Sequence, residues 1–600
     1  MSEAPGVPVT TSTVDPDDWI GRSWLAFQEL EELVENRHPL VAWAWNLLRL
    51  DFCGIAFGAL FFCLSLTPSL MPRTWLFQGL IGGATAAIGY AIGVVVSKLV
   101  LRFWLRNQKW WPPRDRVLAT AKLGVVVLAA VCSLAMIVPA ARWQREIAAL
   151  MEAESPSTLL YSRCFVVSIA VAALFISVAR VLRDLIRLVA RFLIRRLHLS
   201  REVSLLIGTA IVVVLAIMLF NGVLVRGFFA AANASFGPHN DTTRAGVEQP
   251  IQPERSGSPA SLASWESLGF EGRNFVSGGL HANQLTKVSG RQAKEPIRVY
   301  AGLETADTAE ERVDILVREL ERTKAFERKA LIIVPTTGTG WVTPSAARGI
   351  ELMYNGDTAI VATQYSFLPS WISFMADKAK AQVSGKLLIE TIQKRWAQQP
   401  EGHRPKLLIY GESLGSYAGQ AAFDGLGDIR AAGVDGVLWT GPPNFSSIWN
   451  ELVSKRDRGT LEALPVYDSG FTARFAIGPD IDALAKPQWQ TPRVLFVQHP
   501  SDPVTWWSTD LLFSEPDWLK EAPVGDRSST MRWYPIVTFW QVAADLANAV
   551  GVPDGHGHNY GASSVNGWAA IAAPPGWTPQ DTERIRKALD DTASLDGPDT

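Results

Sequence analysis

The hydrophobic pattern of the chain changes near residue 230. Before that point, apolar residues form long runs in which charged residues are rare, and about 20 such residues in a helix are enough to cross a bilayer. Five runs of this kind predict transmembrane spans at residues 52–71, 75–96, 117–138, 159–179 and 203–225. We therefore expect a helical membrane domain over residues 51–229, preceded by a polar and then amphipathic segment over residues 1–50.

Lysine and arginine are unevenly distributed among the loops between these spans. Residues 102–116, in the loop after the second span, include five basic residues and the loop after the fourth span carries seven, whereas the first loop contains only Arg73. Cytoplasmic loops retain positive charge, so residues 1–50 are predicted to be cytoplasmic and everything after residue 225 extracytoplasmic. The arginine-rich stretch 181–198 is typical either of a basic amphipathic helix on the inner leaflet or of a plain extension of the fourth span.

Beyond the spans, residues 230–265 are rich in Gly, Pro, Ser and Asn and lack periodicity, which predicts a linker. The remainder, residues 266–600, alternates short β-branched runs with helical patterns, as expected for buried parallel strands joined by crossover helices. The predicted strands are "IRVYAGL", "ALIIVP", "TAIVATQY", "KLLIYG", "GVLWTGPP" and "RVLFVQH", and helices are expected at 309–322, 376–396 and 414–423. The fold class is thus a helical membrane domain followed by a three-layer α/β domain with a mostly parallel sheet.

Composition narrows the classes of function. Hydrophobic residues make up 48% and charged residues 19% of the chain, and the formal net charge is only −2, so nothing points to a nucleic-acid partner. All four cysteines lie in the first third of the chain and no CxxC occurs. The C-terminal two thirds therefore contain neither a disulfide nor a Cys-ligated metal site.

The segment "KLLIYGESLGS" joins a predicted strand to a predicted helix through a G-x-S-x-G turn. A nucleophile elbow needs small residues at Gly411 and Gly415, because the strained serine brings strand and helix very close together. A bare match to this motif is weak, but the strand before it and the helix after it favour Ser413 as a nucleophile. The alternative is a serine that only occupies a tight turn.

A serine nucleophile needs a base and an orienting carboxylate, which follow it in the order acid, then histidine, in this kind of fold. Asp502 lies in the loop after the last predicted strand and is the candidate acid; the alternative is an aspartate that only initiates a turn before Pro503. The histidines that follow are His556 and His558, in the glycine-rich "PDGHGHNYG". We favour His558 as the base and keep His556 as the alternative; a metal site at these two histidines lacks a further ligand pattern nearby.

The tetrahedral intermediate of acyl transfer needs two preorganised hydrogen-bond donors. One is expected to be the amide of Leu414, directly after the serine. The other is expected in the loop "TTGTGW" after the second predicted strand, where Thr337 and Gly338 are the candidates. A phosphate-binding loop is the alternative, but no Lys-Ser/Thr pair follows it. Substrate contacts are expected from Trp341, Glu412 and Trp506.

Several longer motifs carry a resemblance to a known family. In order, "SLGFEGRNFVSGG", "PTTGTGW", "QYSFLPSW", "GESLGS", "QHPSDPVTWW" and "GHGHNYG" follow a multi-span region. With this arrangement the chain resembles a family of membrane-embedded α/β-hydrolases from actinobacteria. The resemblance implies a serine hydrolase with Ser413, Asp502 and a histidine of the 556–558 loop, and no cofactor. Residues 529–550 have helical rather than strand spacing, so the histidine is expected on a loop without its own strand, as in cutinase-like hydrolases.

These features lead to two hypotheses from different classes. The first is a membrane-anchored serine esterase or lipase that acts on a lipid or an acylated cell-envelope ester; an acyltransferase would use the same triad, since the two activities share an acyl-enzyme. The abundant tryptophans, 23 in all, suit acyl chains and membrane interfaces. The second is a non-catalytic membrane scaffold or transport-associated protein whose hydrolase-like domain only binds, which would explain more spans than an anchor requires.

Overall fold

The computed structural model describes residues 50–103, 115–369, 372–374, 377–478, 488–561 and 563–592. The predicted cytoplasmic segment 1–50 and the centre of the basic loop after the second span therefore lie outside the described residues, apart from Leu50. The chain divides into two compact units. The helical unit comprises residues 1–67, 73–143 and 156–216, and the sheet unit comprises Pro68–Pro72, Gln144–Ser155 and Ile217–Thr600.

Apolar helices occupy all five regions predicted to span the membrane. They are α3 (Phe52–Ser65), α4 (Trp75–Phe103), α5 (Asp115–Leu150), α7 (Arg163–Leu197) and α8 (Arg201–Leu219). Among the described residues, four helices are long and apolar enough to cross a membrane, so the predicted number of five is corrected. The exception is α3, whose 14 residues extend only about 21 Å against the roughly 30 Å of a hydrocarbon core.

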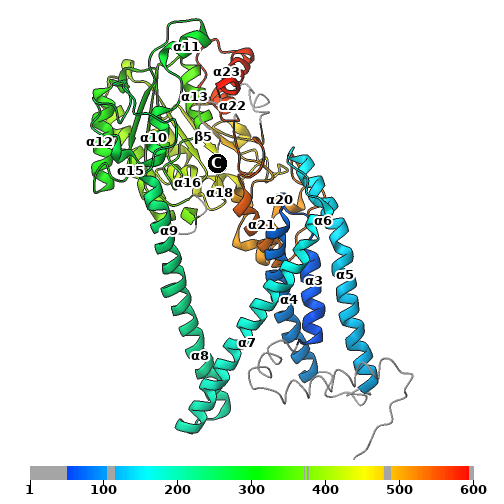
Figure 1. Cartoon of the computed structure of the whole chain (residues 1–600). Helices are drawn as coiled ribbons and strands as arrows, with labels where there is room; N and C mark the ends of the chain where they lie inside the picture. Colours follow the sequence, from blue (N-terminus) through cyan, green and yellow to red (C-terminus); the bar gives the residue numbers. More distant parts are fainter. Residues whose placement is uncertain are drawn as a thin grey trace, which may run out of the picture. The chain divides into compact units, whose positions relative to one another are not determined.

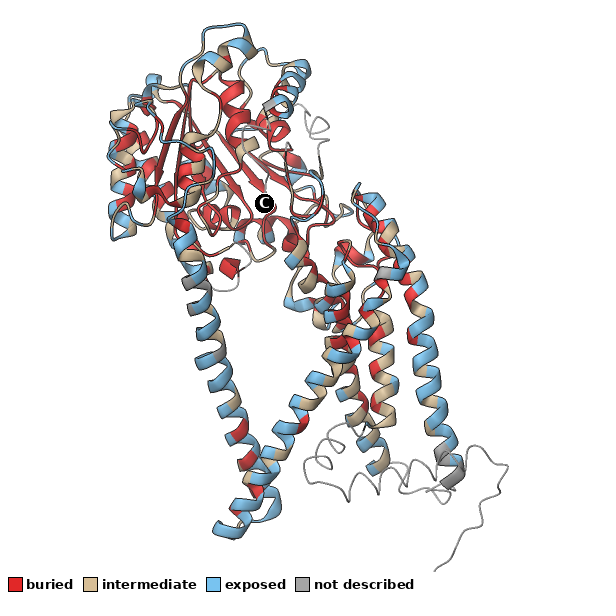
Figure 2. Cartoon of the chain, viewed as in Figure 1, coloured by how far each residue is buried: buried red, intermediate tan, exposed pale blue. Residues whose placement is uncertain are grey.

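The surfaces of the long helices are apolar and uncovered. Large hydrophobic side chains are exposed along α5, α7 and α8, and these ribbons are mostly pale blue in Figure 2. A surface of this kind is stable against lipid tails rather than water. The arginine-rich stretch 181–198 continues α7 without a break up to Leu197, in agreement with an extension of the fourth span.

A seven-stranded parallel sheet organises the sheet unit, with the order β1-β3-β2-β4-β5-β7-β6. The strands are β1 (Ile297–Ala301), β2 (Ala330–Pro335), β3 (Thr358–Thr363), β4 (Lys406–Glu412), β5 (Gly436–Thr440), β6 (Ala473–Ala476) and β7 (Arg493–Val497). Six of them fall on the six predicted strands. The seventh, β6, was not predicted because "ARFA" lacks a β-branched run; it forms an edge paired only to β7.

Helices cover both faces of this sheet, as Figure 1 shows. On one face lie α12 (Ala309–Arg322), α15 (Lys378–Ala397) and α16 (Leu414–Gln420), and on the other lie α13 (Pro344–Met353), α22 (Ser563–Ala572) and α23 (Pro579–Thr592). Successive strand residues alternate between two buried clusters: Ile333 and Ile409 belong to one, and Ile332 and Leu408 to the other. Because side chains alternate between the two faces of a strand, the sheet has a hydrophobic core on each side.

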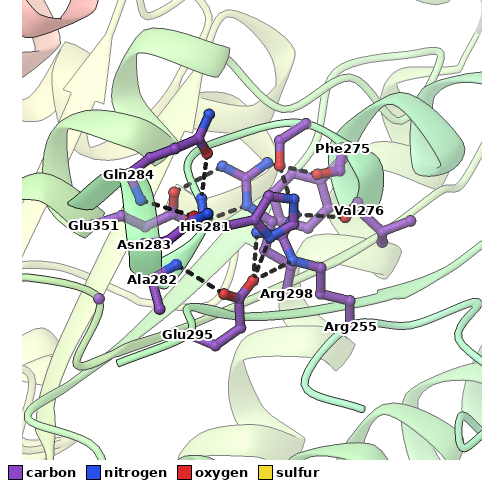
Figure 3. Close-up of polar contacts among 12 residues, drawn as sticks. Arg255, Phe275, Val276, His281, Ala282, Asn283, Gln284, Glu295, Arg298 and Glu351 are labelled. Carbon is purple, nitrogen blue, oxygen red and sulfur yellow. Dashed lines mark hydrogen bonds and ion pairs between the residues drawn. The ribbon is translucent and has the colours of Figure 1, made fainter. Parts of the chain in front are cut away.

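The predicted linker, residues 230–265, is partly helical and partly packed. Helix α9 (Arg226–Asn240) extends into the linker region. Further along it, the Arg255 side chain is fully buried. Arg255 donates hydrogen bonds to the carbonyls of Val276 and Gly278 and pairs with Glu295 at 3.0 Å (Figure 3). No local pattern indicates this packing, because the partners of Arg255 lie 21 to 40 residues away.

A second buried ion pair, between Arg298 of β1 and Glu351 of α13, lies in the same network (Figure 3). Two parallel hydrogen bonds of 2.8 Å join the guanidinium to the carboxylate, and both side chains are at most 3% exposed. Removing one charge of a buried pair leaves the other desolvated and unpaired.

We expect Glu351→Gln to lower the free energy of unfolding by about 3–5 kcal/mol and the melting temperature by roughly 5–15 °C. Tryptophan fluorescence of the purified full chain in detergent measures this change. The matched control is Glu451→Gln, which breaks the exposed pair with Lys455 and should leave the melting temperature almost unchanged. Equal melting temperatures for the two variants would contradict the expectation.

Candidate active site

The G-x-S-x-G turn lies at the end of the central strand β4 and directly before α16. Ser413 has φ 55° and ψ −124°, a conformation that L residues other than glycine rarely adopt. A Cβ added at Gly411 would come within 2.6 Å of the Gly415 carbonyl oxygen, and one at Gly415 within 2.3 Å of the Pro335 carbonyl oxygen. Only glycines allow this approach of strand and helix, so the turn has the geometry of a nucleophile elbow.

Asp502 follows β7 and is completely buried. Its carboxylate accepts hydrogen bonds from the Val504 amide at 2.8 Å and from the Tyr560 hydroxyl at 2.7 Å, and it lies 2.7 Å from Nδ1 of His558. Burial alone would raise the pKa of Asp502, but the charge and hydrogen bonds of His558 and Tyr560 outweigh it and lower the pKa below its usual value. The carboxylate is therefore ionised and fixes the orientation of the His558 ring.

His558 is buried, at 7% exposed. Burial lowers its pKa, but the charge and hydrogen bond of Asp502, with a smaller contribution from Glu412, raise it to a net value above 6.5. Nε2 of the ring has no hydrogen-bond partner among the described residues, so the Ser413 hydroxyl is not bonded to it in this structure. Catalytic hydrogen bonds of this type are often long before substrate binds.

The end of β5 brings the serine and the histidine into one neighbourhood. The Ser413 amide donates to the Thr440 carbonyl at 2.9 Å. The next residue, Gly441, has φ 53°, and a Cβ there would lie 2.7 Å from Cε1 of His558. The His558 ring thus packs directly on the backbone that holds Ser413.

The second histidine of the glycine-rich loop has a carboxylate of its own. Nδ1 of His556 lies 2.9 Å from Asp526, and its side chain is 21% exposed. The hydrogen bond with Asp526 raises the pKa of His556. Of the two candidates for the base, the structure pairs only His558 with Asp502. No strand lies between Asp502 and this loop in the described residues, and α21 (Val537–Asp545) occupies part of the interval, as the sequence predicted.

The loop after β2 lies against the elbow, since the Pro335 carbonyl approaches Gly415. Thr337 in this loop is buried, and its hydroxyl has no hydrogen-bond partner among the described residues. Gly338 packs so closely on Ser373 that a Cβ would come within 2.4 Å of its hydroxyl oxygen. Leu414 is the first residue of α16, so its amide lies outside the helical hydrogen-bond ladder. Of the predicted oxyanion donors, the Leu414 amide thus directly follows Ser413, and Thr337 lies in the loop whose Pro335 carbonyl approaches Gly415.

Comparison with known families agrees with this geometry. Residues 297–585 match the model of an alpha/beta-hydrolase family, and residues 66–279 match the model of the N-terminal region of an alpha/beta-hydrolase family. The chain belongs to the alpha/beta-hydrolase family. No curated protein matches it. No solved structure matches it either. Family membership suggests hydrolase activity, and the matched N-terminal region contains the apolar helices of this alpha/beta-hydrolase.

The three predicted substrate contacts of this alpha/beta-hydrolase have different surroundings. Trp341 is half-buried and lines a cavity of about 400 Å³ that does not include Ser413, Asp502 or His558. Glu412 is buried and accepts hydrogen bonds from Thr343 and Tyr410 at 2.7 and 2.6 Å. Trp506 is 2% exposed, packs against Trp449 and Trp518 and donates a hydrogen bond to the His499 carbonyl.

Sequence reasoning did not assign roles to three residues that contact Asp502, His558 or His556. The Tyr560 hydroxyl donates a hydrogen bond to Asp502. Its position two residues after His558 was the only feature of the sequence that could have indicated this role. Gly441 follows a predicted strand and carries the His558 ring. Asp526 lies in a loop without any motif, so nothing local indicates its pairing with His556.

Proposed function

We propose that the chain is a membrane-anchored serine hydrolase that cleaves esters of lipids or of acylated cell-envelope components. Ser413 is the proposed nucleophile, His558 the base and Asp502 the group that orients the base. The observation that carries this proposal is the strained turn at Ser413 beside a buried His558–Asp502 pair. This combination costs conformational and desolvation free energy that a purely structural turn does not require.

The proposed reaction follows from this arrangement. His558 removes the hydroxyl proton as Ser413 attacks the ester carbonyl, and Asp502 stabilises the imidazolium that forms. The Leu414 amide and donors of the Thr337–Gly338 loop stabilise the oxyanion. His558 then gives its proton to the departing alcohol, which leaves an acyl-enzyme at Ser413. Water, activated by the same histidine, attacks the acyl-enzyme and releases the acid.

The membrane helices support the choice of substrate. Four long helices of the described region could span a bilayer. The turn Pro68–Pro72, the segment Gln144–Ser155 and the sheet all belong to one unit. The basic residues in the loops after the second and fourth predicted spans support an active site outside the cytoplasm, where it would meet lipids and acylated envelope molecules.

Hydrolysis of p-nitrophenyl esters by the purified full chain in detergent tests the proposal. We expect turnover of esters with acyl chains of several lengths and little turnover of the corresponding p-nitroanilides, because an amine is a much poorer leaving group. A folded, monodisperse protein that hydrolyses none of these esters would contradict the proposal.

The pH profile provides a separate prediction. His558 accepts a proton only when neutral, and its pKa is raised above 6.5, so kcat/KM should rise with pH through a midpoint above 6.5. Glu412→Gln removes a negative charge that favours the imidazolium, and the midpoint should therefore move to lower pH. Glu451→Gln, at an exposed site, is the control and should leave it in place. An upward shift in Glu412→Gln would contradict this electrostatic coupling.

A further inference from the structure

Two loops that connect the apolar helices contribute to the core of the sheet unit. They are Pro68–Pro72, between α3 and α4, and Gln144–Ser155, at the end of α5. Leu70, Met71, Ile147 and Met151 are at most 1% exposed and belong to the same buried cluster as Ile333 and Ile409 of the sheet. The core of the sheet unit therefore incorporates side chains that precede its first strand, β1, by 146 to 227 residues.

The first of these loops is held by polar contacts as well. Asp545, at the end of α21, accepts hydrogen bonds from the Ser69 hydroxyl and from the Leu70 amide, the latter at 3.1 Å. Asp545 is 1% exposed, so these bonds are shielded from water. Asn548, three residues later, donates to the Pro72 carbonyl at 3.4 Å. The turn is thereby fixed to the segment that leads into the histidine loop.

Met71 reaches the residue next to the proposed base. A Cβ added at Gly557 would lie 2.8 Å from Cε and 2.9 Å from Sδ of Met71, which shows that the thioether packs on the Gly557 backbone. The other contacts of this backbone are polar: the Gly557 amide donates to Ser501 at 2.9 Å, and its carbonyl lies 2.9 Å from Nδ1 of His499. The His558 amide donates to Ala549 at 2.8 Å. Met71 thus supplies the apolar side of the support beneath His558.

We propose that Met71 is a positioning residue for the catalytic base: the turn between α3 and α4 holds the Gly557–His558 backbone at the place from which the imidazole reaches Ser413. This inference rests on the proposed function, because it assigns the turn to the geometry of the proposed triad. Met71 would act by packing rather than by proton transfer, since a thioether neither donates nor accepts a proton in the reaction. Displacement of a catalytic group by about 1 Å can cost up to roughly 100-fold in rate.

The test compares three variants of the full chain in detergent with p-nitrophenyl ester as substrate. Met71→Ala should lower kcat at least about 10-fold while KM stays within about twofold, because only the alignment of the base changes. Met71→Leu, which conserves volume, should recover most of kcat. Met353→Ala is the matched control: it truncates a methionine that is 2% exposed in the cluster on the opposite face of the sheet, and kcat should remain near the wild-type value.

Several outcomes would overturn the inference. One is a wild-type kcat in folded Met71→Ala, and another is an equal loss of kcat in Met353→Ala, which would indicate general destabilisation. If Met71→Ala does not fold, Ser69→Ala gives the same test by removing one hydrogen bond to Asp545, and an unchanged kcat there would count against the inference. Wild-type protein without esterase activity would instead overturn the proposed function, so the two failures are distinguishable.

Discussion

Replacement of Ser413 by alanine is expected to lower kcat for ester hydrolysis by about 10⁴–10⁶-fold, with KM changed little. The substitution removes only the hydroxyl group, and the acyl-enzyme cannot form without it. The elbow itself should persist, because the backbone strain at φ 55° is the same for serine and alanine. Steady-state hydrolysis of a p-nitrophenyl ester by the two purified proteins measures the effect.

Ser416→Ala is the control for this measurement. Ser416 lies in the same helix, is completely buried and accepts a hydrogen bond from Gln420 at 3.0 Å. Its replacement perturbs the packing of α16 without removing the nucleophile, so kcat should stay within about 10-fold of wild type. A comparable loss of kcat in Ser413→Ala and Ser416→Ala would contradict the role of Ser413 as nucleophile, because it would show that the packing of α16 alone explains the loss.

His558→Ala should reduce kcat by about 10⁴-fold or more, whereas His556→Ala should keep kcat within about 10-fold. The two histidines lie two positions apart in the same loop. Comparing the two variants therefore shows which histidine, and so which of the carboxylates Asp502 and Asp526, the reaction depends on. His558 contacts Asp502 and packs on Gly441, and its Nε2 has no hydrogen-bond partner in the part of the chain that the structure describes. His556 contacts Asp526 and is partly exposed. Kinetics with the same ester distinguishes them.

The reverse ranking of these two variants would contradict the assignment of the base. Asp526→Asn adds a check on the alternative, because it should weaken the His556 contact while leaving the Asp502–His558 pair intact. Under the proposed mechanism, its kcat should resemble that of His556→Ala. A loss as large as that of His558→Ala would instead point to His556 as the base.

The sequence was sufficient where local patterns determine structure. Uninterrupted β-branched runs such as "ALIIVP" and "RVLFV" are buried parallel strands, and glycines on both sides of Ser413 predicted the approach of β4 and α16. The position of Asp502 after a strand likewise predicted that it lies at the carboxyl edge of the sheet. These inferences need only the period of the strands and the chain order of the motif.

Tertiary contacts decided what the sequence left open. The glycine-rich loop offered both His556 and His558, with His558 only favoured, and the structure pairs His558 with Asp502 and His556 with Asp526. Abundant tryptophan suggested a substrate surface, yet Trp506 packs inside an aromatic core. The contact between Ser69 and Asp545 joins residues 476 positions apart, and no local pattern encodes it. The first apolar run was long enough for a span, but α3 ends at Ser65, before Pro68 and Pro72.

Covalent labelling with a fluorophosphonate is the most direct test of Ser413 as an activated nucleophile. The full chain in detergent would be treated with the probe, digested and mapped by tandem mass spectrometry. The account predicts one modified serine, in the peptide that contains "GESLGS", with labelling lost in Ser413→Ala and strongly slowed in His558→Ala. A folded wild-type protein that is not labelled, or is labelled at another serine, would contradict it.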